Sequence, residues 1–423
     1  MKKALVPGLL FSLILLVACS STQAAQPLIG GYVPKTPDAV SNIAPEPVSG
    51  KTAFEYFRDE GLAVGWNLGN TLDAWNASDS GEDVGWGNPR ANQAIFDGVK
   101  EAGYDLVRIP VTWKGHIGPA PDYRIRESYL RRVAEVVAHA KNAGFRAVII
   151  NLHHDGSTES GGRDNGWLSI NTARKDEAGY NKVTFEFVRV WQQIAAYFKN
   201  HGDYLMFESF NELHDGGWGW SDENQQRPQY AIINEWNQFF TNAVRDSGGN
   251  NDKRFLIIQG YSAAAKHTIA NYFVLPADSV PGRQIVSFHY YDPYEFGILG
   301  DQRGGFSEWG SDSDKEKVDK DFAPFKAKFT GNSIPVIIGE SGAVRQLYPA
   351  DRAKEDRARL ARLEYISHVY GKAKEYGLVP VYWDNGAVTG GGEKFGLFNR
   401  SNGKPNPDES YAVIDAMINS AKN

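Results

Sequence analysis

The sequence predicts a single (β/α)₈ barrel, and three features support this prediction. Eight short apolar runs, rich in β-branched residues, recur along the chain as buried parallel strands do. Amphipathic segments of helical length separate the runs, and several end in glycine, as helix C-termini favour. The region with this pattern, residues 51–423, is long for an average domain but ordinary for a barrel with loop insertions. The alternative, a doubly wound open sheet, is disfavoured because no convincing glycine-rich phosphate-binding motif follows the first run.

The elements follow in a regular order. The expected strands are Leu62–Leu68, Leu106–Val111, Ala147–Leu152, Leu205–Phe210, Phe255–Ile258, Ile285–Phe288, Val336–Ile338 and Val379–Tyr382. The clearest helical segments are Glu127–Asn142 and Asp351–Tyr376, with Gly144 and Gly377 just beyond their ends. Because strand and helix alternate eight times and no second core is visible, closure into one barrel is the natural arrangement.

Residues 1–18 predict an export signal. Two lysines precede the uncharged run Ala4–Val17, which is too short to span a bilayer comfortably. The run Leu16–Cys19 resembles the lipobox of bacterial lipoproteins, which implies that Cys19 is lipidated and becomes the mature N-terminus. Ser20 follows it, as in lipoproteins sent to the outer membrane of Gram-negative bacteria. A chance cysteine after an ordinary secretory signal is the alternative.

The composition limits the classes of molecule that the chain is expected to bind. Residues 19–50 are rich in Ser, Pro, Ala and Gly, which predicts a flexible linker, so that the membrane is contacted through the lipid only. Cys19 is the only cysteine, so the folded part has no disulfide, thiolate metal site or cysteine nucleophile. A formal net charge of −6 argues against nucleic acid as a partner. Aromatic residues make up 13% of the chain; they suit sugar binding, although a large barrel also packs many in its core.

Polar residues gather where the expected strands end. In this fold the C-terminal ends of all strands converge on one face, where active sites lie. We therefore expect one pocket lined by Asn67, Asn70, Arg108, His153, His154, Asn211, Glu212, His289, Tyr291, Glu340 and Trp383.

Two carboxyl groups in this set, Glu212 and Glu340, follow the fourth and seventh runs and can face each other across the barrel axis. Glycosidic cleavage with retention needs two carboxyl groups about 5 to 5.5 Å apart, one protonated and one ionised. Arg108 and Tyr291 can keep Glu340 ionised, while partial burial near His289 can keep Glu212 protonated. Rim glutamates in surface ion pairs are the alternative.

Seven motifs, in this order and spacing, resemble glycoside hydrolase family 5. They are Gly65-Trp66-Asn67-Leu68-Gly69-Asn70-Thr71-Leu72-Asp73, Val107-Arg108-Ile109-Pro110-Val111-Thr112-Trp113, Asn151-Leu152-His153-His154, Phe210-Asn211-Glu212, His289-Tyr290-Tyr291, Ile338-Gly339-Glu340-Ser341 and Tyr382-Trp383-Asp384-Asn385. The resemblance covers residue 51 to the end.

The resemblance implies a retaining endo-β-1,4-glucanase with Glu212 as general acid/base and Glu340 as nucleophile. It also implies that Asn211 binds the sugar 2-hydroxyl. The other residues of the shell around the cleaved sugar would be Arg108, His153, His289, Tyr291 and Trp383. His154 is less clear, because its side chain could face away from the pocket.

The run Gly65–Asp73, together with Gly85-Trp86-Gly87-Asn88-Pro89, most resembles the endoglucanase and xyloglucanase branch of the family. The expected substrate is thus a β-1,4-glucan: xyloglucan, cellulose or mixed-linkage glucan. An endo-β-mannanase and a non-catalytic lipid-anchored glycan-binding protein are the alternatives. We expect a monomer in the cell envelope. Some of the loop tryptophans could form stacking platforms along a cleft, and anchoring of the loops is the alternative for each: Trp75, Trp86, Trp113, Trp167, Trp218, Trp220 and Trp309.

No cofactor and no metal are expected. The run His153-His154-Asp155 contains ligand types, so a metal-dependent hydrolase is a further alternative. It is disfavoured because adjacent residues of a strand point to opposite faces.

Overall fold

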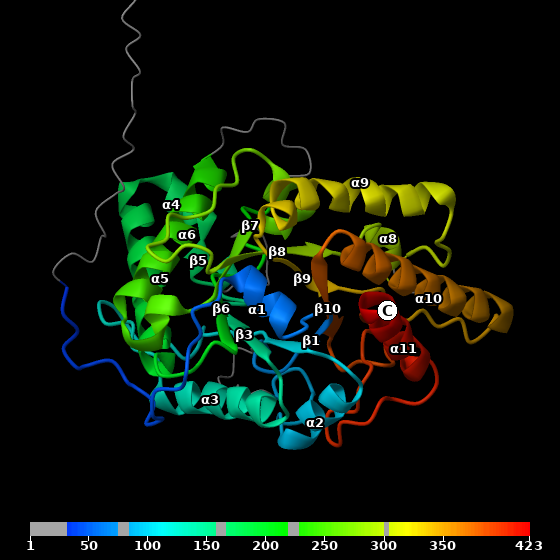
Figure 1. Cartoon of the computed structure of the whole chain (residues 1–423), viewed down its shortest axis with the longest axis horizontal. Helices are drawn as coiled ribbons and strands as arrows, with labels where there is room; N and C mark the ends of the chain where they lie inside the picture. The colour runs from blue at the N-terminus through cyan, green and yellow to red at the C-terminus, as the bar shows by residue number, and fades with distance from the viewer. Residues whose placement is uncertain (1–31, 75–83, 158–165, 219–227, 300–303) are drawn as a thin grey trace, which may run out of the picture.

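The computed structural model describes residues 32–74, 84–157, 166–218, 228–299 and 304–423. In these ranges eight parallel strands form a closed barrel surrounded by helices, which confirms the predicted fold (Figure 1). The barrel strands, in chain order, are β1 (Gly65–Leu68), β2 (Leu106–Ile109), β3 (Ala147–Asn151), β6 (Leu205–Glu208), β7 (Leu256–Ala264), β8 (Gln284–Tyr290), β9 (Val336–Ser341) and β10 (Leu378–Asp384). Around the barrel they lie in the order β1-β10-β9-β8-β7-β6-β3-β2.

Each expected apolar run overlaps one barrel strand, with differences at the ends. The first strand begins at Gly65 rather than Leu62, because the amide of Leu62 closes the end of a helix by bonding to the Phe57 carbonyl. The seventh strand extends past Ile338 to Ser341, because the backbone ladder continues under the polar residues at its end. Short β4 (Gly156–Ser157) and β5 (Leu168–Ser169) pair outside the barrel.

The helices pack around the strands. They are α1 (Ala53–Asp59), α2 (Gln93–Glu101), α3 (Glu127–Asn142), α4 (Ile170–Lys175), α5 (Glu177–Phe198), α6 (Pro228–Asp246), α7 (Ala265–Ile269), α8 (Tyr294–Gly297), α9 (Asp312–Lys328), α10 (Arg352–Glu375) and α11 (Ser410–Lys422), with 3₁₀ turns at Gly249–Lys253 and Thr330–Asn332. Gly144 and Gly377, just beyond α3 and α10, have φ of +90° and +72°. Glycine adopts this left-handed conformation without a Cβ clash, which explains why these helices end there.

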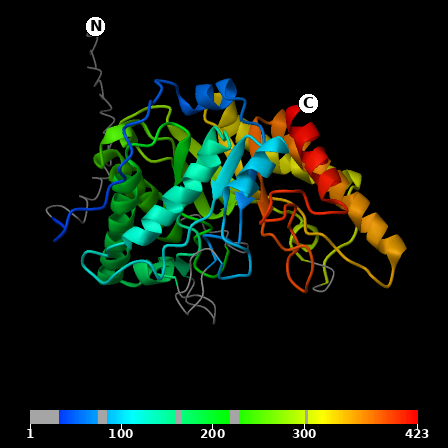
Figure 2. The same ribbon diagram turned by 90° about the horizontal axis from the view of Figure 1, so that it is seen from below.

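The core has two layers. The larger layer lies between strands and helices, and the smaller one fills the barrel with side chains such as Ile149, Met206, Ile257 and Ile337. Helix α1 closes the N-terminal end of the barrel by packing its apolar side chains against the smaller layer. Figure 2 shows α1 at one edge of the molecule and the long loop after β10 at the opposite edge. The C-terminal strand ends are therefore the end available for a site.

Residues 32–50 differ from the flexible linker that their composition favours. Asp38 pairs with the buried Arg189 of α5 at 3.0 Å, and a carboxylate oxygen of Glu46 accepts the Gly202 amide at 2.8 Å. These bonds hold the segment against the barrel, because each satisfies a polar group that would otherwise lose its partner. The expected signal, Cys19 and the rest of the linker lie outside the described residues. Among the described helices, none combines the length and apolarity needed to cross a membrane.

Candidate active site

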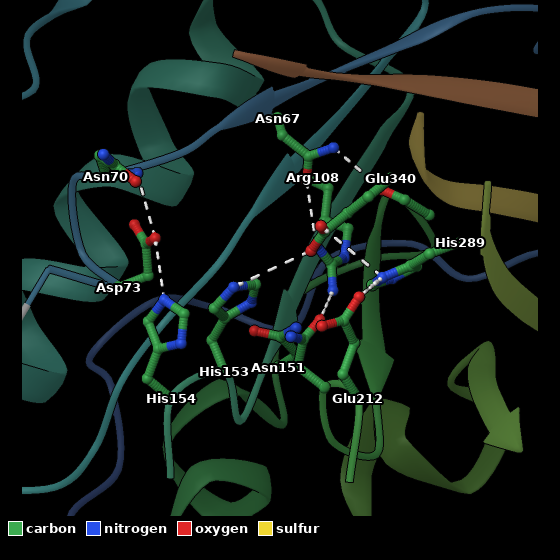
Figure 3. Close-up of polar contacts among 12 residues, drawn as sticks. Asn67, Asn70, Asp73, Arg108, Asn151, His153, His154, Glu212, His289 and Glu340 are labelled. Atoms are coloured by element: carbon green, nitrogen blue, oxygen red, sulfur yellow. Dashed lines mark hydrogen bonds and ion pairs between the residues drawn. The ribbon is translucent and has the colours of Figure 1, made fainter. Parts of the chain in front are cut away.

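Glu212 and Glu340 lie close together at the C-terminal end of the barrel (Figure 3). One oxygen of each carboxyl group lies within 4.8 Å of the other and of a ring nitrogen of His289. The Glu212 side chain is 29% exposed and that of Glu340 8%, so Glu212 is the more open to a ligand. The spacing matches double displacement and is too short for the intervening water of a single displacement, which needs about 6.5 to 9.5 Å.

The backbone of Glu212 is in the left-handed region, with φ of +46°. This conformation is unfavourable for a residue with a side chain and is found mainly where the surroundings enforce it. The amide of Glu212 donates to Oε1 of Gln259 at 3.1 Å, which holds the turn directly after β6. The turn aims the carboxyl group toward His289, whose Nδ1 lies 2.6 Å from Oε1 of Glu212.

Glu340 receives one hydrogen bond on each oxygen. Nη1 of Arg108 lies 2.9 Å from Oε1, and the Tyr291 hydroxyl donates to Oε2 at 3.0 Å. Burial, followed by the charge of Glu340, raises the pKa of Tyr291 well above its usual value, so the phenol keeps its proton and remains a donor. Arg108 and Tyr291 therefore make the contacts through which they are expected to keep Glu340 ionised, whereas burial raises the pKa of Glu340 and opposes that ionisation.

A fully buried layer lies under Glu340. Nε of Arg108 pairs with Glu208 at 2.7 Å, and Nη2 donates to Oδ1 of Asn211 at 2.7 Å. Burial by itself would lower the pKa of Arg108, but Glu208 and Glu340 outweigh it and raise the pKa. The guanidinium is 0% exposed, so Arg108 acts on a ligand through Glu340 and Asn211 rather than by lining the pocket as predicted.

Asn67 also lies in this layer, and its prediction as a substrate-binding residue is wrong. Its side chain is fully buried. The amide nitrogen donates to the backbone carbonyls of Gly339 and Tyr382, and the amide oxygen accepts from Arg108 at 3.0 Å. Asn67 therefore joins β1 to β9 and β10 and fixes Arg108 of β2, because its buried side chain meets the barrel core.

Glu212, Glu340 and His289 share the mobile protons of the site, so the pKa of each depends on the charge of the others. Burial would raise the pKa of Glu212, but the hydrogen bond and charge of His289 outweigh it and lower the pKa. Burial raises the pKa of Glu340 more than His289 and Arg108 lower it. Burial would lower the pKa of His289, but Glu340 and Glu212 raise it. The directions for Glu212 and Glu340 oppose the prediction of a protonated Glu212 beside an ionised Glu340.

His153 and Trp383 form one wall of the site. Their rings are parallel, with centroids 5.6 Å apart, and both side chains are at least nine-tenths buried. Gly69 makes room for the indole, because a Cβ there would lie 2.9 Å from Trp383. Burial lowers the pKa of His153 well below its usual value, so the ring is neutral. Its Nε2 lies 3.9 Å from Glu340, beyond hydrogen-bond distance, and its Nδ1 has no partner among the described residues.

His154 lies beside His153, with ring centroids 4.3 Å apart. Its Nε2 lies 3.6 Å from Asp73, and its ring faces Trp86 at 5.2 Å. The expectation that the adjacent histidines separate is wrong, because both residues lie past the end of β3, where alternation stops. Asn70 has a φ of +54°, and its backbone N–H donates to Asp73. Both residues lie apart from the two glutamates (Figure 3).

Within the part of the chain that the structure describes, two groups contain donor types that bind cations: Asp73 with His153 and His154, and Glu212 with His289 and Glu340. In the first group, Asp73 already accepts the backbone amides of Asn70 and Thr71. In the second, Arg108 supplies positive charge to Glu340.

The loop tryptophans differ in how far their side chains are exposed. Trp86 and Trp218 are 43% and 39% exposed, and Trp218 stacks on His214, two residues after Glu212, at 3.9 Å. Trp113 and Trp309 are buried, so their prediction as stacking platforms is wrong; they anchor loops in the core. Trp167 donates to buried Asp155. Trp75 and Trp220 lie outside the described residues.

Two functional residues were not predicted: Glu208 and Gln259. Both are fully buried, and Nε2 of Gln259 lies 3.0 Å from Oε1 of Glu208. Glu208 is a carboxyl group inside an otherwise apolar run, which signals a buried charge with a partner. Gln259 directly follows the fifth apolar run, the only one at whose end no polar residue was selected.

Comparison with known proteins agrees with this geometry. The profile described as Cellulase (glycosyl hydrolase family 5) matches residues 67–388. An endoglucanase A of Paenibacillus barcinonensis is 35% identical over 84% of this chain and 88% of its own length. A xyloglucan-specific endo-β-1,4-glucanase of Bacteroides ovatus is 34% identical over 85% of this chain and 69% of its own. A structure of a GH5-4 broad specificity endoglucanase from Bacteroides salanitronis is 41% identical, with a TM-score of 0.79 over 90% of this chain and 98% of that chain.

Proposed function

The chain belongs to glycoside hydrolase family 5, and from this premise we propose that its barrel hydrolyses the backbone of β-1,4-glucans internally and with retention. The observation that carries the proposal is the approach of Glu212 and Glu340 to within 4.8 Å, since retaining cleavage needs two carboxyl groups this close. The endoglucanase and xyloglucanase relatives support the same substrate class. A non-catalytic binding protein would have no need of this pair.

Glu340 acts as the nucleophile. Its two oxygens are oriented by Arg108 and Tyr291, and the positive charge of Arg108 favours the carboxylate. The carboxylate attacks the anomeric carbon and forms a glycosyl ester, while the leaving oxygen takes a proton. Because Arg108 is also paired with Glu208, the guanidinium stays in place when the Glu340 charge is consumed.

Glu212 acts as the acid and then as the base. Its Oε1 is held by His289, so Oε2 is the oxygen that faces the leaving group. After protonating the leaving oxygen, the ionised Glu212 takes a proton from water, which attacks the ester and regenerates Glu340. The anomeric carbon is inverted twice, so the product keeps the β configuration.

The remaining pocket residues bind the sugar. Arg108 occupies the carbonyl side of the Asn211 amide, which leaves the nitrogen to donate to a 2-hydroxyl. Trp383 offers an apolar ring at the wall that it shares with neutral His153. His154 and Asn70 lie farther along the same side and would meet the next sugar.

The assignment is tested by initial rates on xyloglucan, carboxymethylcellulose and mannan, with Glu212→Ala and Glu340→Ala as matched controls. We expect hydrolysis of the two glucans, and a loss of several orders of magnitude in both variants while the fold persists. Faster cleavage of mannan than of the two glucans would show that the substrate is a mannan. Activity near that of the unmodified enzyme in either variant would reject the catalytic pair.

We also propose that Cys19 carries lipid and anchors the enzyme to the outer membrane of a Gram-negative envelope. The support is the lipobox-like run Leu16–Cys19 followed by Ser20. The Cys19→Ser variant should then appear in the soluble fraction with unchanged catalytic constants, because Cys19 precedes the barrel by more than thirty residues. A variant that still sediments with membranes would reject the anchor.

A further inference from the structure

Gln259, at the end of the barrel strand β7, is fully buried beneath the catalytic residues. Its side-chain amide contacts three groups: the backbone amide of Glu212, the carboxylate of Glu208 and the ring of His289. Gln259 thus connects Glu208 of the buried layer to His289, the residue that holds Glu212. The role of this amide depends on which way round it lies.

The two ends of the amide are fixed by their neighbours. Oε1 accepts the N–H of Glu212 at 3.1 Å, and Nε2 donates to Oε1 of Glu208 at 3.0 Å. The reverse orientation would place an NH₂ against the N–H of Glu212 and a carbonyl against the Glu208 carboxylate. Both contacts would be repulsive, so hydrogen-bond chemistry permits only one orientation.

The remaining N–H of Gln259 points at His289. Nε2 of Gln259 lies 3.3 Å from Nε2 of the imidazole. An N–H can be accepted only by a ring nitrogen that carries no proton, so the proton of the neutral ring is on Nδ1. That nitrogen lies 2.6 Å from Oε1 of Glu212 and donates to it. A charged imidazole would instead present its Nε2–H to the NH₂ of Gln259.

We propose that Gln259 is a positioning residue that keeps Nε2 of His289 unprotonated and thereby leaves the mobile proton of the site on Oε2 of Glu212. This inference rests on the proposed role of Glu212 as acid. Glu212 can protonate the leaving oxygen only if it holds a proton, and a charged His289 would hold it ionised. The proton passes from Oε2 to the leaving oxygen, and His289 neither gains nor loses one.

The other charged groups around His289 do not make this selection. Glu212 at 2.6 Å and Glu340 at 3.6 Å both face Nδ1 and favour the charged ring. Arg108 opposes that charge from β2, and neutral His153 and Tyr291 face the site from the remaining sides. Glu208 is separated from the ring by Gln259 itself. Among the hydrogen bonds of the described residues, that of the Gln259 amide is the one at Nε2, so this amide discriminates between the two places where the proton could reside.

The test compares two substrates in Gln259→Met, which removes the amide at similar volume. The leaving group of 2,4-dinitrophenyl β-cellobioside needs no proton, whereas that of cellotetraose does. We expect kcat/KM on cellotetraose to fall about a hundredfold, the lower range of general acid catalysis, and kcat/KM on the aryl glycoside to change by less than about threefold. The alkaline limb for cellotetraose should move to higher pH, because His289 then binds the proton more tightly.

The matched control is Gln193→Met. Gln193 is a buried amide of α5 that bonds to Tyr123 and Ile125, away from the site, and its loss should leave the ratio of the two kcat/KM values unchanged. Because this ratio is taken within one preparation, a partly unfolded variant does not affect it. An unchanged ratio in Gln259→Met, or the same change in Gln193→Met, would overturn the inference.

A second measurement needs no variant at Gln259. In ¹⁵N NMR of the histidine-labelled enzyme, with His289→Asn used to assign the signal, Nε2 of His289 should be unprotonated at the pH of maximal activity. A protonated Nε2 there would overturn the inference. Glu212→Ala separates the two claims. If this variant lowers kcat/KM equally for both substrates, the acid role of Glu212 fails. If Glu212→Ala lowers kcat/KM mainly for cellotetraose but Gln259→Met does not, the inference alone fails.

Discussion

Nη1 of Arg108 lies 2.9 Å from Oε1 of Glu340, on a guanidinium that is fully buried and whose Nε is paired with Glu208. The same guanidinium also donates to Asn67 and Asn211. One planar side chain therefore positions the nucleophile and the residue next to the acid/base, which a point charge cannot do.

Arg108→Lys should therefore lower kcat/KM on cellotetraose by about a hundredfold or more, because losing one preorganised donor costs about that much. Buried Glu208 would also lose its bonded partner, so the thermal midpoint should fall. Kinetics combined with circular dichroism separates the two effects. Wild-type rates in a folded Arg108→Lys protein would show that the guanidinium is not needed for catalysis.

Tyr291→Phe should move the acidic limb of the pH dependence of kcat/KM to higher pH. The phenol donates to Oε2 of Glu340 and stabilises the carboxylate, so its loss raises the pKa of Glu340, which must be ionised to attack. The control is Tyr290→Phe, because that hydroxyl bonds to Asp321 instead. Equal shifts in both variants would contradict a specific contact with Glu340.

Trp86→Ala and Trp218→Ala should raise KM for polymeric glucan by up to about tenfold, since one aromatic contact contributes about 0.5 to 1.5 kcal/mol. Both rings are exposed, and each lies against a histidine near the site. We expect kcat to change by less than a factor of about two. Leu360→Ala, an exposed apolar side chain on α10, is the control. An unchanged KM in both tryptophan variants would exclude the two platforms.

His201 should make the protein less stable at acidic pH. Burial, followed by the charge of Arg254, lowers the pKa of His201 to about 4, against about 6.5 in an unfolded chain. The unfolded state thus binds the proton first as the pH falls, and up to about 3 kcal/mol of stability is lost between pH 6.5 and 4. Denaturant unfolding of His201→Gln should show a shallower decline there and the native pH dependence above pH 7. Parallel curves for the two proteins would contradict this assignment.

The barrel and most of the site were predictable because one rule connects sequence to position: parallel strands present their C-terminal residues at one face. Glu212, Glu340, His289 and Trp383 follow from it directly. How deeply each side chain is buried does not follow from this rule, because the residue after an apolar run can point into the pocket or lie beneath it. Asn67 and Arg108 therefore look like pocket residues in the sequence but lie in the buried layer.

Other differences arise where contacts join distant segments. The bonds of Asp38 and Glu46 to the barrel span more than 150 residues, and composition alone cannot indicate them. Trp113 is buried and Trp86 is exposed, although both tryptophans lie in segments that follow barrel strands. Gln259 directly follows the fifth apolar run, so the same strand-end rule points to it.

The central claim is that Glu340 forms the covalent intermediate, and trapping that intermediate tests it most directly. A 2-deoxy-2-fluoro-β-cellobioside with a dinitrophenyl leaving group should inactivate the enzyme, because the fluorine slows both steps while the reactive leaving group keeps formation of the ester fast. Peptide mass spectrometry should then locate one cellobiosyl group on Glu340. A label on Glu212 or on any other residue would contradict the assignment of the nucleophile.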